Sequence, residues 1–195
     1  MKTENQLSAH QFKAMYEKEG IDLATLGCVM LDTEPIPKPL MYEREIPEAF
    51  YTSPDEKKFW IKGYVADQTP HVTLLYGLMT PANEQPENIA TVMEGWSLDS
   101  VVIEEFGFFE STMKDEPYYC IVGHIEVTSK LLEGHERLQF LPHIDTFAGY
   151  RPHITIAYVV KDEAIRDRVI NDMNKMYAGK ELTVSRKLNL GGNKA

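Results

Sequence analysis

The sequence predicts an α+β fold made of two similar lobes. Apolar runs of strand length alternate along the chain with longer segments that have helical periodicity. Two neighbouring strands are joined by a short polar segment, which is typical of a hairpin. A seven-residue motif also occurs once in each half of the chain. Mixed elements, a hairpin and an internal repeat together favour a duplicated α+β architecture.

Each element follows from its local pattern. The helix expected in the middle of the chain places Ile89, Val92, Met93 and Trp96 on one face. Four prolines between residues 33 and 47 predict an irregular loop. We expect helices over residues 8–19, 87–96, 129–140 and 163–177, and strands over residues 26–31, 71–76, 100–109, 118–127, 153–160 and 182–190.

The chain has 195 residues, of which 43% are hydrophobic, and this is enough for one domain with a well-formed core. We expect a single bilobal domain over residues 1–195. Residues 1–25 are interpreted as an N-terminal helical extension, and residues 186–195 as a flexible C-terminal tail.

Composition restricts the partners and the compartment. The net charge is −10, and a protein that repels polyanions is poorly suited to long nucleic acids, whereas a small phosphorylated ligand needs only a few local cations. No apolar stretch is long enough to span a membrane, and the first residues lack the apolar core of a signal peptide. Cys28 and Cys120 each lie in an apolar run and are expected to be buried thiols rather than a disulfide. We therefore expect a cytoplasmic protein with no membrane partner.

The repeated motif is the most informative feature of the sequence. Residues 70–76 read PHVTLLY and residues 152–158 read PHITIAY. Both fit Pro-His-(Val/Ile)-Thr-(Leu/Ile)-x-Tyr, with one free position in seven. A single His-x-Thr has little meaning, but two copies that agree over this length are unlikely to be a coincidence.

The motif predicts an acid–base site. In a strand, side chains two residues apart share a face, so His71 lies beside Thr73 and His153 beside Thr155. One imidazole can remove a proton from an attacking oxygen while the other protonates the leaving oxygen. The two threonine hydroxyls can donate hydrogen bonds to a phosphate. The alternatives are weaker: a single strand histidine is more often structural, and two histidines without a third ligand do not make a zinc site. We expect neither a metal nor a cofactor.

These residues resemble the two motifs of the 2H (two-histidine) phosphoesterase superfamily. The resemblance covers the chain from about residue 26 onward. It implies a bilobal duplicated fold in which two antiparallel sheets face a central cleft, with helices on the outside. It also implies that His71 and His153 form the acid–base pair, with Thr73 and Thr155 as phosphate donors. Within the superfamily, residues 71–77, 118–122 and 141–143 look like the phage anti-CBASS nucleases, which degrade the cyclic oligonucleotide signals of bacterial antiviral defence.

Further residues are candidates for binding the substrate. Tyr42 and Trp60 have aromatic rings that can stack on bases, although core or loop packing is the alternative for both. Arg151, next to the second motif, can contact phosphate, as can Lys62, for which surface charge is the simpler interpretation. Glu181 can enter the cleft or remain a solvated edge charge. Neither His124 nor His143 has a threonine two residues later, so both are interpreted as structural.

The resulting functional hypothesis is a metal-independent phosphodiesterase that hydrolyses the 3′–5′ linkages of a cyclic di- or trinucleotide. One alternative is an RNA-end enzyme, either a 2′,3′-cyclic phosphodiesterase or a 2′–5′ RNA ligase, which is expected to have a basic groove. The other is a protein that sequesters cyclic nucleotides without cleaving them, which would not require an intact acid–base pair. Oligomeric state, base preference and the division of roles between the histidines remain open at this stage.

Overall fold

The computed structural model describes residues 18–21, 25–34, 36, 70–110, 118–147 and 149–191. It has the predicted α+β class, with three α-helices and one 3₁₀ helix among these residues. Most of the helix expected over residues 8–19, and of the proline-rich loop over residues 33–47, lies outside the described residues.

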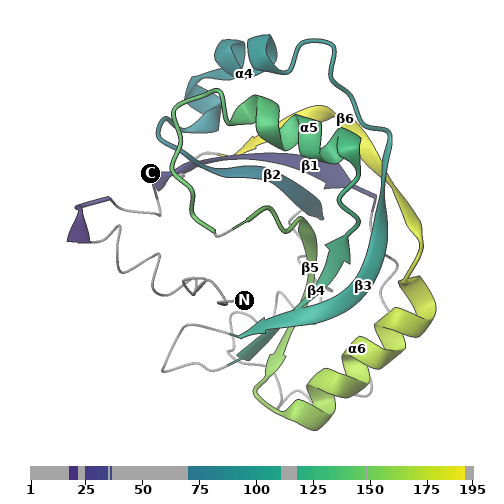
Figure 1. The fold of residues 1–195 in the computed structure, drawn as a ribbon. Coiled ribbons are helices and arrows are strands. Elements are labelled where there is room, and N and C mark those ends of the chain that lie inside the picture. The colour runs from purple at the N-terminus through teal and green to yellow at the C-terminus, as the bar shows by residue number, and fades with distance from the viewer. Residues whose placement is uncertain are drawn as a thin grey trace, which may run out of the picture.

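The strands form one curled antiparallel sheet (Figure 1). The expectation of two separate sheets is wrong, because β6 pairs with β1 along most of its length and with β3 through residues 181–183. That junction joins two three-stranded halves, and the strand order is β2-β1-β6-β3-β4-β5. The strands are β1 Gly27–Thr33, β2 His71–Leu78, β3 Ser100–Glu110, β4 Tyr118–Ile125, β5 His153–Val160 and β6 Glu181–Gly191.

Two expected strand ends need correction. The last strand was expected over residues 182–190 and a flexible tail from residue 186. β6 runs from Glu181 to Gly191, so residues 186–191 belong to the strand, because β1 supplies hydrogen-bonding partners for residues 188–191. β2 was expected to end at residue 76, before Gly77, but continues to Leu78. Gly77 is needed for another reason: its φ is +123°, and a Cβ there would collide with the carbonyl oxygen of Ile144.

The helices begin where suitable caps occur. Helix α5 (Ser129–Leu138) is capped by the Thr128 hydroxyl, which accepts from the Leu131 amide at 3.2 Å. Helix α6 (Glu163–Tyr177) is capped by Asp162, whose carboxylate accepts from the amides of residues 164 and 165. Helix α4 (Pro86–Val92) follows the 3₁₀ helix Ala82–Glu84 and ends earlier than the expected Trp96. The chain turns there, and the Trp96 indole donates to the carbonyl of Lys130 at the start of α5 (2.9 Å).

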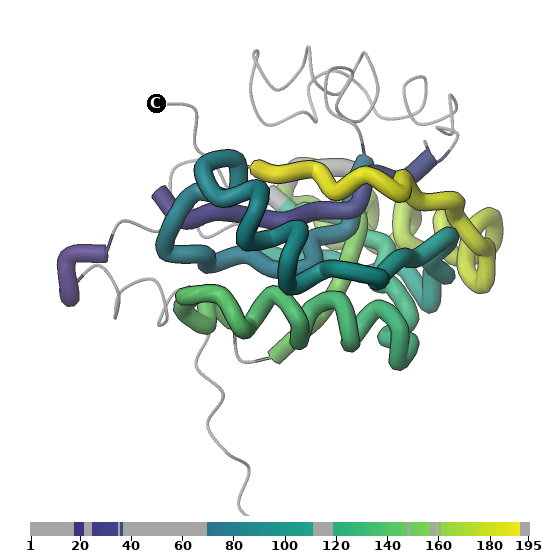
Figure 2. Tube along the Cα trace, turned by 90° about the horizontal axis from the view of Figure 1, so that it is seen from above, coloured from purple at the N-terminus to yellow at the C-terminus, as the bar shows by residue number. Residues whose placement is uncertain are grey.

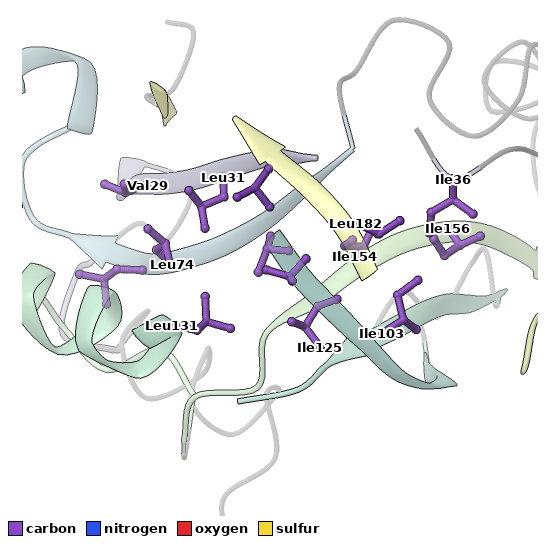
Figure 3. Packing of buried hydrophobic residues seen from close by; sticks show 14 of the residues in the cluster. Val29, Leu31, Ile36, Leu74, Ile103, Ile125, Leu131, Ile154, Ile156 and Leu182 are labelled. Carbon is purple, nitrogen blue, oxygen red and sulfur yellow. The ribbon is translucent and has the colours of Figure 1, made fainter. Parts of the chain in front are cut away.

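The helices cover the apolar side of the sheet. Helix α5 packs on β2, and α6 packs on β3, β4 and β5 (Figures 1 and 2). Leu74 of β2 and Leu131 of α5 belong to the same buried cluster as Ile103, Ile125 and Ile154 of the other half (Figure 3). One continuous core therefore holds both halves in a fixed relation. No helix in the described part of the chain is long and apolar enough to cross a membrane.

Candidate active site

The two strands that carry the repeated motif are the two edges of the sheet. β2 and β5 stand at opposite ends of the strand order, yet they lie close to each other because the sheet curls. His71 is the first residue of β2, and His153 is the first residue of β5. His153 lies near enough to His71 for the two imidazoles to interact electrostatically. Residues 82 positions apart are thus brought together by the curvature of the sheet.

Each motif strand has the two faces that its sequence predicts. On β2, Val72 and Leu74 are fully buried, whereas His71 and Thr73 are half-buried. On β5, residues 154 and 156 are buried, whereas residues 153 and 155 are half-buried. The predicted separation of an apolar face from a His/Thr face is confirmed on both strands.

His153 has a defined orientation. Its Nδ1 lies 2.9 Å from the carbonyl oxygen of Arg151. A carbonyl only accepts hydrogen bonds, so Nδ1 carries the proton and Nε2 is the acceptor of the neutral ring. Burial lowers the pKa of His153 below its ordinary value, and the nearby imidazoles of His124 and His71 lower it further, against the opposite effect of the Arg151 carbonyl. The neutral form of His153 is therefore favoured.

A third histidine lies beside His153. His124 of β4 is paired directly opposite His153 on β5, and directly opposite residues of antiparallel strands share a face. The Phe109 ring contacts both imidazoles edge-on, with centroids 6.0 Å from His124 and 4.9 Å from His153. On β3, Gly107 leaves space for the His124 ring, because a Cβ there would lie 2.8 Å from Nε2. The interpretation of His124 as purely structural missed this arrangement, which strand pairing reveals and a local motif does not.

His71 has a different neighbour. Asp32 of β1 is paired directly opposite His71, so its half-buried carboxylate lies on the same face of the sheet. The side-chain amide of Asn189 on β6 donates to Asp32 Oδ1 at 2.8 Å and holds this carboxylate in place. Neither Asp32 nor Asn189 was predicted to be a site residue. The only local signal was an acidic residue at the end of an otherwise apolar strand.

Thr73 is supported from both sides. Its hydroxyl shares a hydrogen bond with the Cys28 thiol, and burial raises the pKa of that thiol to about 11. Its carbonyl accepts from the Tyr150 hydroxyl at 3.2 Å, and burial raises the pKa of that phenol. The Tyr150 ring stacks on His135 with centroids 4.0 Å apart, and His135 Nδ1 lies 2.7 Å from the Leu74 carbonyl. These contacts fix the backbone of β2 at the motif.

Of the other predicted site residues, Arg151 and Glu181 lie among the described residues. Arg151 is exposed and adjoins the site through its carbonyl contact with His153. Glu181 is exposed at the junction of β6 with β3, where the Ser100 hydroxyl donates to its carboxylate. Tyr42, Trp60 and Lys62 lie outside the described residues. Substrate binding by any of these side chains stays a prediction.

Two further observations concern metals and His143. Across the described ranges, no group of three or more His, Cys, Asp or Glu side chains is arranged to hold a metal ion. His143 Nδ1 lies 2.8 Å from the Leu141 carbonyl, and its Nε2 lies 3.6 Å from an Asp145 carboxylate oxygen. Its backbone also bridges to Leu78 at the end of β2. These contacts agree with the structural interpretation of His143.

Residues 47–189 match the family model of the 2′-5′ RNA ligase superfamily. The chain belongs to this superfamily. The expected two-histidine phosphoesterase family is thereby confirmed at the superfamily level, and with it phosphoesterase chemistry, while assignment to the anti-CBASS branch stays a prediction.

Two solved structures of Usb1 from Kluyveromyces marxianus are also similar to this chain. The one with uridine monophosphate is 10% identical, with a TM-score of 0.44, and the alignment covers 88% of this chain and 99% of that one. The other is 9% identical with the same TM-score, covering 87% and 99%. No curated protein matches the sequence.

Proposed function

We propose that this protein is a metal-independent phosphodiesterase that hydrolyses the 3′–5′ linkages of cyclic oligonucleotide second messengers. The observation that carries the proposal is the convergence of two Pro-His-x-Thr strands from opposite edges of one sheet. In this proposal, His71 and His153 exchange protons with the substrate, and Thr73 and Thr155 donate to the phosphate. Destroying such signals would block CBASS antiviral defence in the bacterial cytoplasm.

The chemistry uses the substrate's own sugar. One imidazole removes the proton of the ribose 2′-hydroxyl, whose oxygen attacks the adjacent phosphorus. The bond to the 5′-oxygen breaks, and the other imidazole protonates that oxygen. The products are a 2′,3′-cyclic phosphate and a 5′-hydroxyl, and water opens the cyclic phosphate in a second step. An internal nucleophile is favoured because it is already positioned beside the phosphorus.

The supports of Thr73 suit phosphate binding. The Tyr150 hydroxyl donates to the Thr73 carbonyl at 3.2 Å and so helps to hold the strand that carries this side chain. The Thr73 hydroxyl is proposed to donate to a non-bridging phosphate oxygen, whose charge must be stabilised in the transition state.

The charge of the protein favours a small substrate. At −10, the field of the whole chain repels a long polyanion but allows a dinucleotide to be held by local contacts. Arg151 lies two residues before His153, is exposed, and is proposed to contact a phosphate. Tyr42 and Trp60 are proposed to stack on the bases, and Glu181 to contact the substrate from β6.

A second candidate function is cleavage or ligation at RNA ends. The description of the matched family, the 2′-5′ RNA ligase superfamily, favours this alternative. It uses the same pair of histidines and differs in the substrate that the surrounding surface accepts.

Substrate comparison tests both proposals. Purified protein is incubated with ribo cyclic di- and trinucleotides and, in parallel, with short linear RNAs that end in a 3′-hydroxyl or a 2′,3′-cyclic phosphate, and the products are resolved chromatographically. We expect cleavage of a cyclic nucleotide through a 2′,3′-cyclic phosphate. Turnover of linear RNA alone would favour the second function, and tight binding without turnover would indicate sequestration.

The matched control is the same cyclic nucleotide with 2′-deoxyribose beside the scissile linkage. It should bind but not be cleaved, because it lacks the internal nucleophile. Equal cleavage of both would show that water attacks directly, leaving the histidine pair in place but removing the 2′-hydroxyl from the mechanism.

A further inference from the structure

The two edges of the sheet have equivalent backbones and opposite chemistry. On one edge, β1 pairs with β2 so that Asp32 stands opposite His71. On the other edge, β4 pairs with β5 so that His124 stands opposite His153. The strand order is symmetrical about the boundary between β6 and β3, so the two pairs occupy corresponding positions. One motif histidine therefore has an acidic neighbour, and the other has a basic one.

The neighbour of His71 is a carboxylate. On the same face, at the separation of directly opposite strand residues, it is an acceptor toward which a ring N–H of His71 can be oriented. Asn189 donates to Asp32 Oδ1 at 2.8 Å and keeps the carboxylate oriented from the third strand. Asn189 and Asp32 both lie in the half of the sheet that carries His71.

The neighbours of His153 favour a neutral ring. His124 can only be neutral or positive, and the edge of Phe109 packs against both imidazoles. The Arg151 carbonyl takes the Nδ1 proton, so Nε2 of the neutral ring can accept a proton. Among the described residues, the contacts of His153 therefore include no carboxylate that would favour an imidazolium.

We infer that His153 is the general base and His71 the general acid, and that Asp32 and His124 are the positioning residues that impose these roles. This assignment rests on the proposed phosphodiesterase function and adds two residues and a direction of proton transfer to it. His153 Nε2 takes the proton of the attacking hydroxyl as the new O–P bond forms. The leaving O–P bond breaks as His71 gives its proton to the 5′-oxygen, and solvent later returns both rings to their starting states.

A sulfur leaving group separates the two roles. Thiolates are far weaker bases than alkoxides, so a substrate with sulfur in place of the 5′-bridging oxygen does not need a general acid. The experiment compares the oxygen and sulfur forms of one ribo cyclic dinucleotide with wild-type protein and four variants. The variants are His71→Ala and Asp32→Asn from one edge, and His153→Ala and His124→Asn from the other.

We expect the sulfur substrate to restore turnover of the two variants on the β1–β2 edge but not of the two variants on the β4–β5 edge. His71→Ala should lose about 100- to 10,000-fold on the oxygen substrate and return to near wild-type turnover on the sulfur substrate. Asp32→Asn should lose about 10-fold on the oxygen substrate, as expected for the loss of one charge-assisted hydrogen bond that orients His71, and recover likewise. His153→Ala and His124→Asn should show the same deficit on both substrates.

Thermal unfolding of each variant checks that it is folded, and His71→Gln and His153→Gln replace the alanine variants if those unfold. Sulfur rescue of His153→Ala, or rescue of neither histidine variant, would overturn the assignment. If Asp32→Asn lost the same amount of turnover on both substrates, Asp32 would not act through the general acid His71.

The same oxygen–sulfur pair is also made as a linear diribonucleotide, so that an error in the substrate class can be recognised. If wild-type protein cleaves only the linear pair, the proposed cyclic substrate class is wrong. The acid and base roles are then determined with the oxygen and sulfur forms of the linear substrate. If it cleaves neither, both the phosphodiesterase function and this assignment fall.

Discussion

The β1–β2 edge and the β4–β5 edge of the sheet show how a repeated motif can support two unequal tasks. Both edges place a His and a Thr on one face of an edge strand and aliphatic side chains on the other. They differ one strand further in, where Asp32 stands on one side and His124 on the other. The comparison teaches that the motif positions the imidazoles, while the neighbouring strand decides which polar group lies beside each imidazole.

Removing either histidine gives the largest expected effect and tests whether both edges are required. His71→Ala and His153→Ala should each reduce turnover by roughly 100- to 10,000-fold, because general acid–base groups contribute this much individually. Steady-state kinetics of the purified variants measure the loss, and circular dichroism with thermal unfolding serves as the folding control. Near-normal turnover of one variant would mean that catalysis requires only the other histidine.

The threonines should show a smaller and more equal effect. Thr73→Val and Thr155→Val each remove one hydrogen bond to the phosphate while keeping a β-branched side chain in the strand. A charge-assisted hydrogen bond contributes about 1.5–3 kcal/mol, so we expect kcat to fall by about 10- to 100-fold. A rise in KM with unchanged kcat would mean that the hydroxyls bind substrate and transition state equally well.

The pH profile of turnover tests whether the two histidines begin the reaction in different protonation states. It should be bell-shaped, because one histidine begins neutral and the other protonated. Burial lowers the pKa of His153 below its ordinary value of about 6.5, so a base at this position keeps its neutral form as the pH falls. Activity should therefore persist below pH 6.5 before the acid limb begins.

His124→Asn is the matched test of that limb. It removes one of the two neighbouring imidazoles that lower the pKa of His153, so the acid limb should move to higher pH. Kinetics between about pH 4.5 and 9 on both proteins measure the difference. A limb that stays in place, or moves to lower pH, would contradict the electrostatic influence of His124 on His153.

Chelation of metal ions should not change turnover. Activity is expected to survive excess EDTA, since the proposed mechanism assigns every proton transfer and phosphate contact to side chains. The measurement is turnover after EDTA treatment and gel filtration, with a metal-dependent phosphodiesterase treated in parallel as the control. Loss of turnover that one added metal restores would replace the two-histidine mechanism with a metal-assisted one.

Much of the fold could be predicted from the sequence because it depends on local pattern. β5 and α6 begin and end where expected, since alternation and helical periodicity are read over a few consecutive residues. The His/Thr faces of β2 and β5 were also predictable, because side chains in any strand alternate with a period of two. Errors fell at element ends, such as α4 and β6, where a tertiary partner decides whether the backbone continues in the same conformation.

The neighbours of the histidines belong to the tertiary structure. Asp32 stands opposite His71, and His124 opposite His153, only because of the register in which the strands pair. β6 joins the halves into one sheet because it pairs with both β1 and β3, a long-range choice that no local pattern encodes. The sequence by itself determined the residues of the motif and the faces on which they lie. Curvature and register decided that the two motifs meet and that their surroundings differ, because electrostatic neighbours are set by distance in space rather than by separation along the chain.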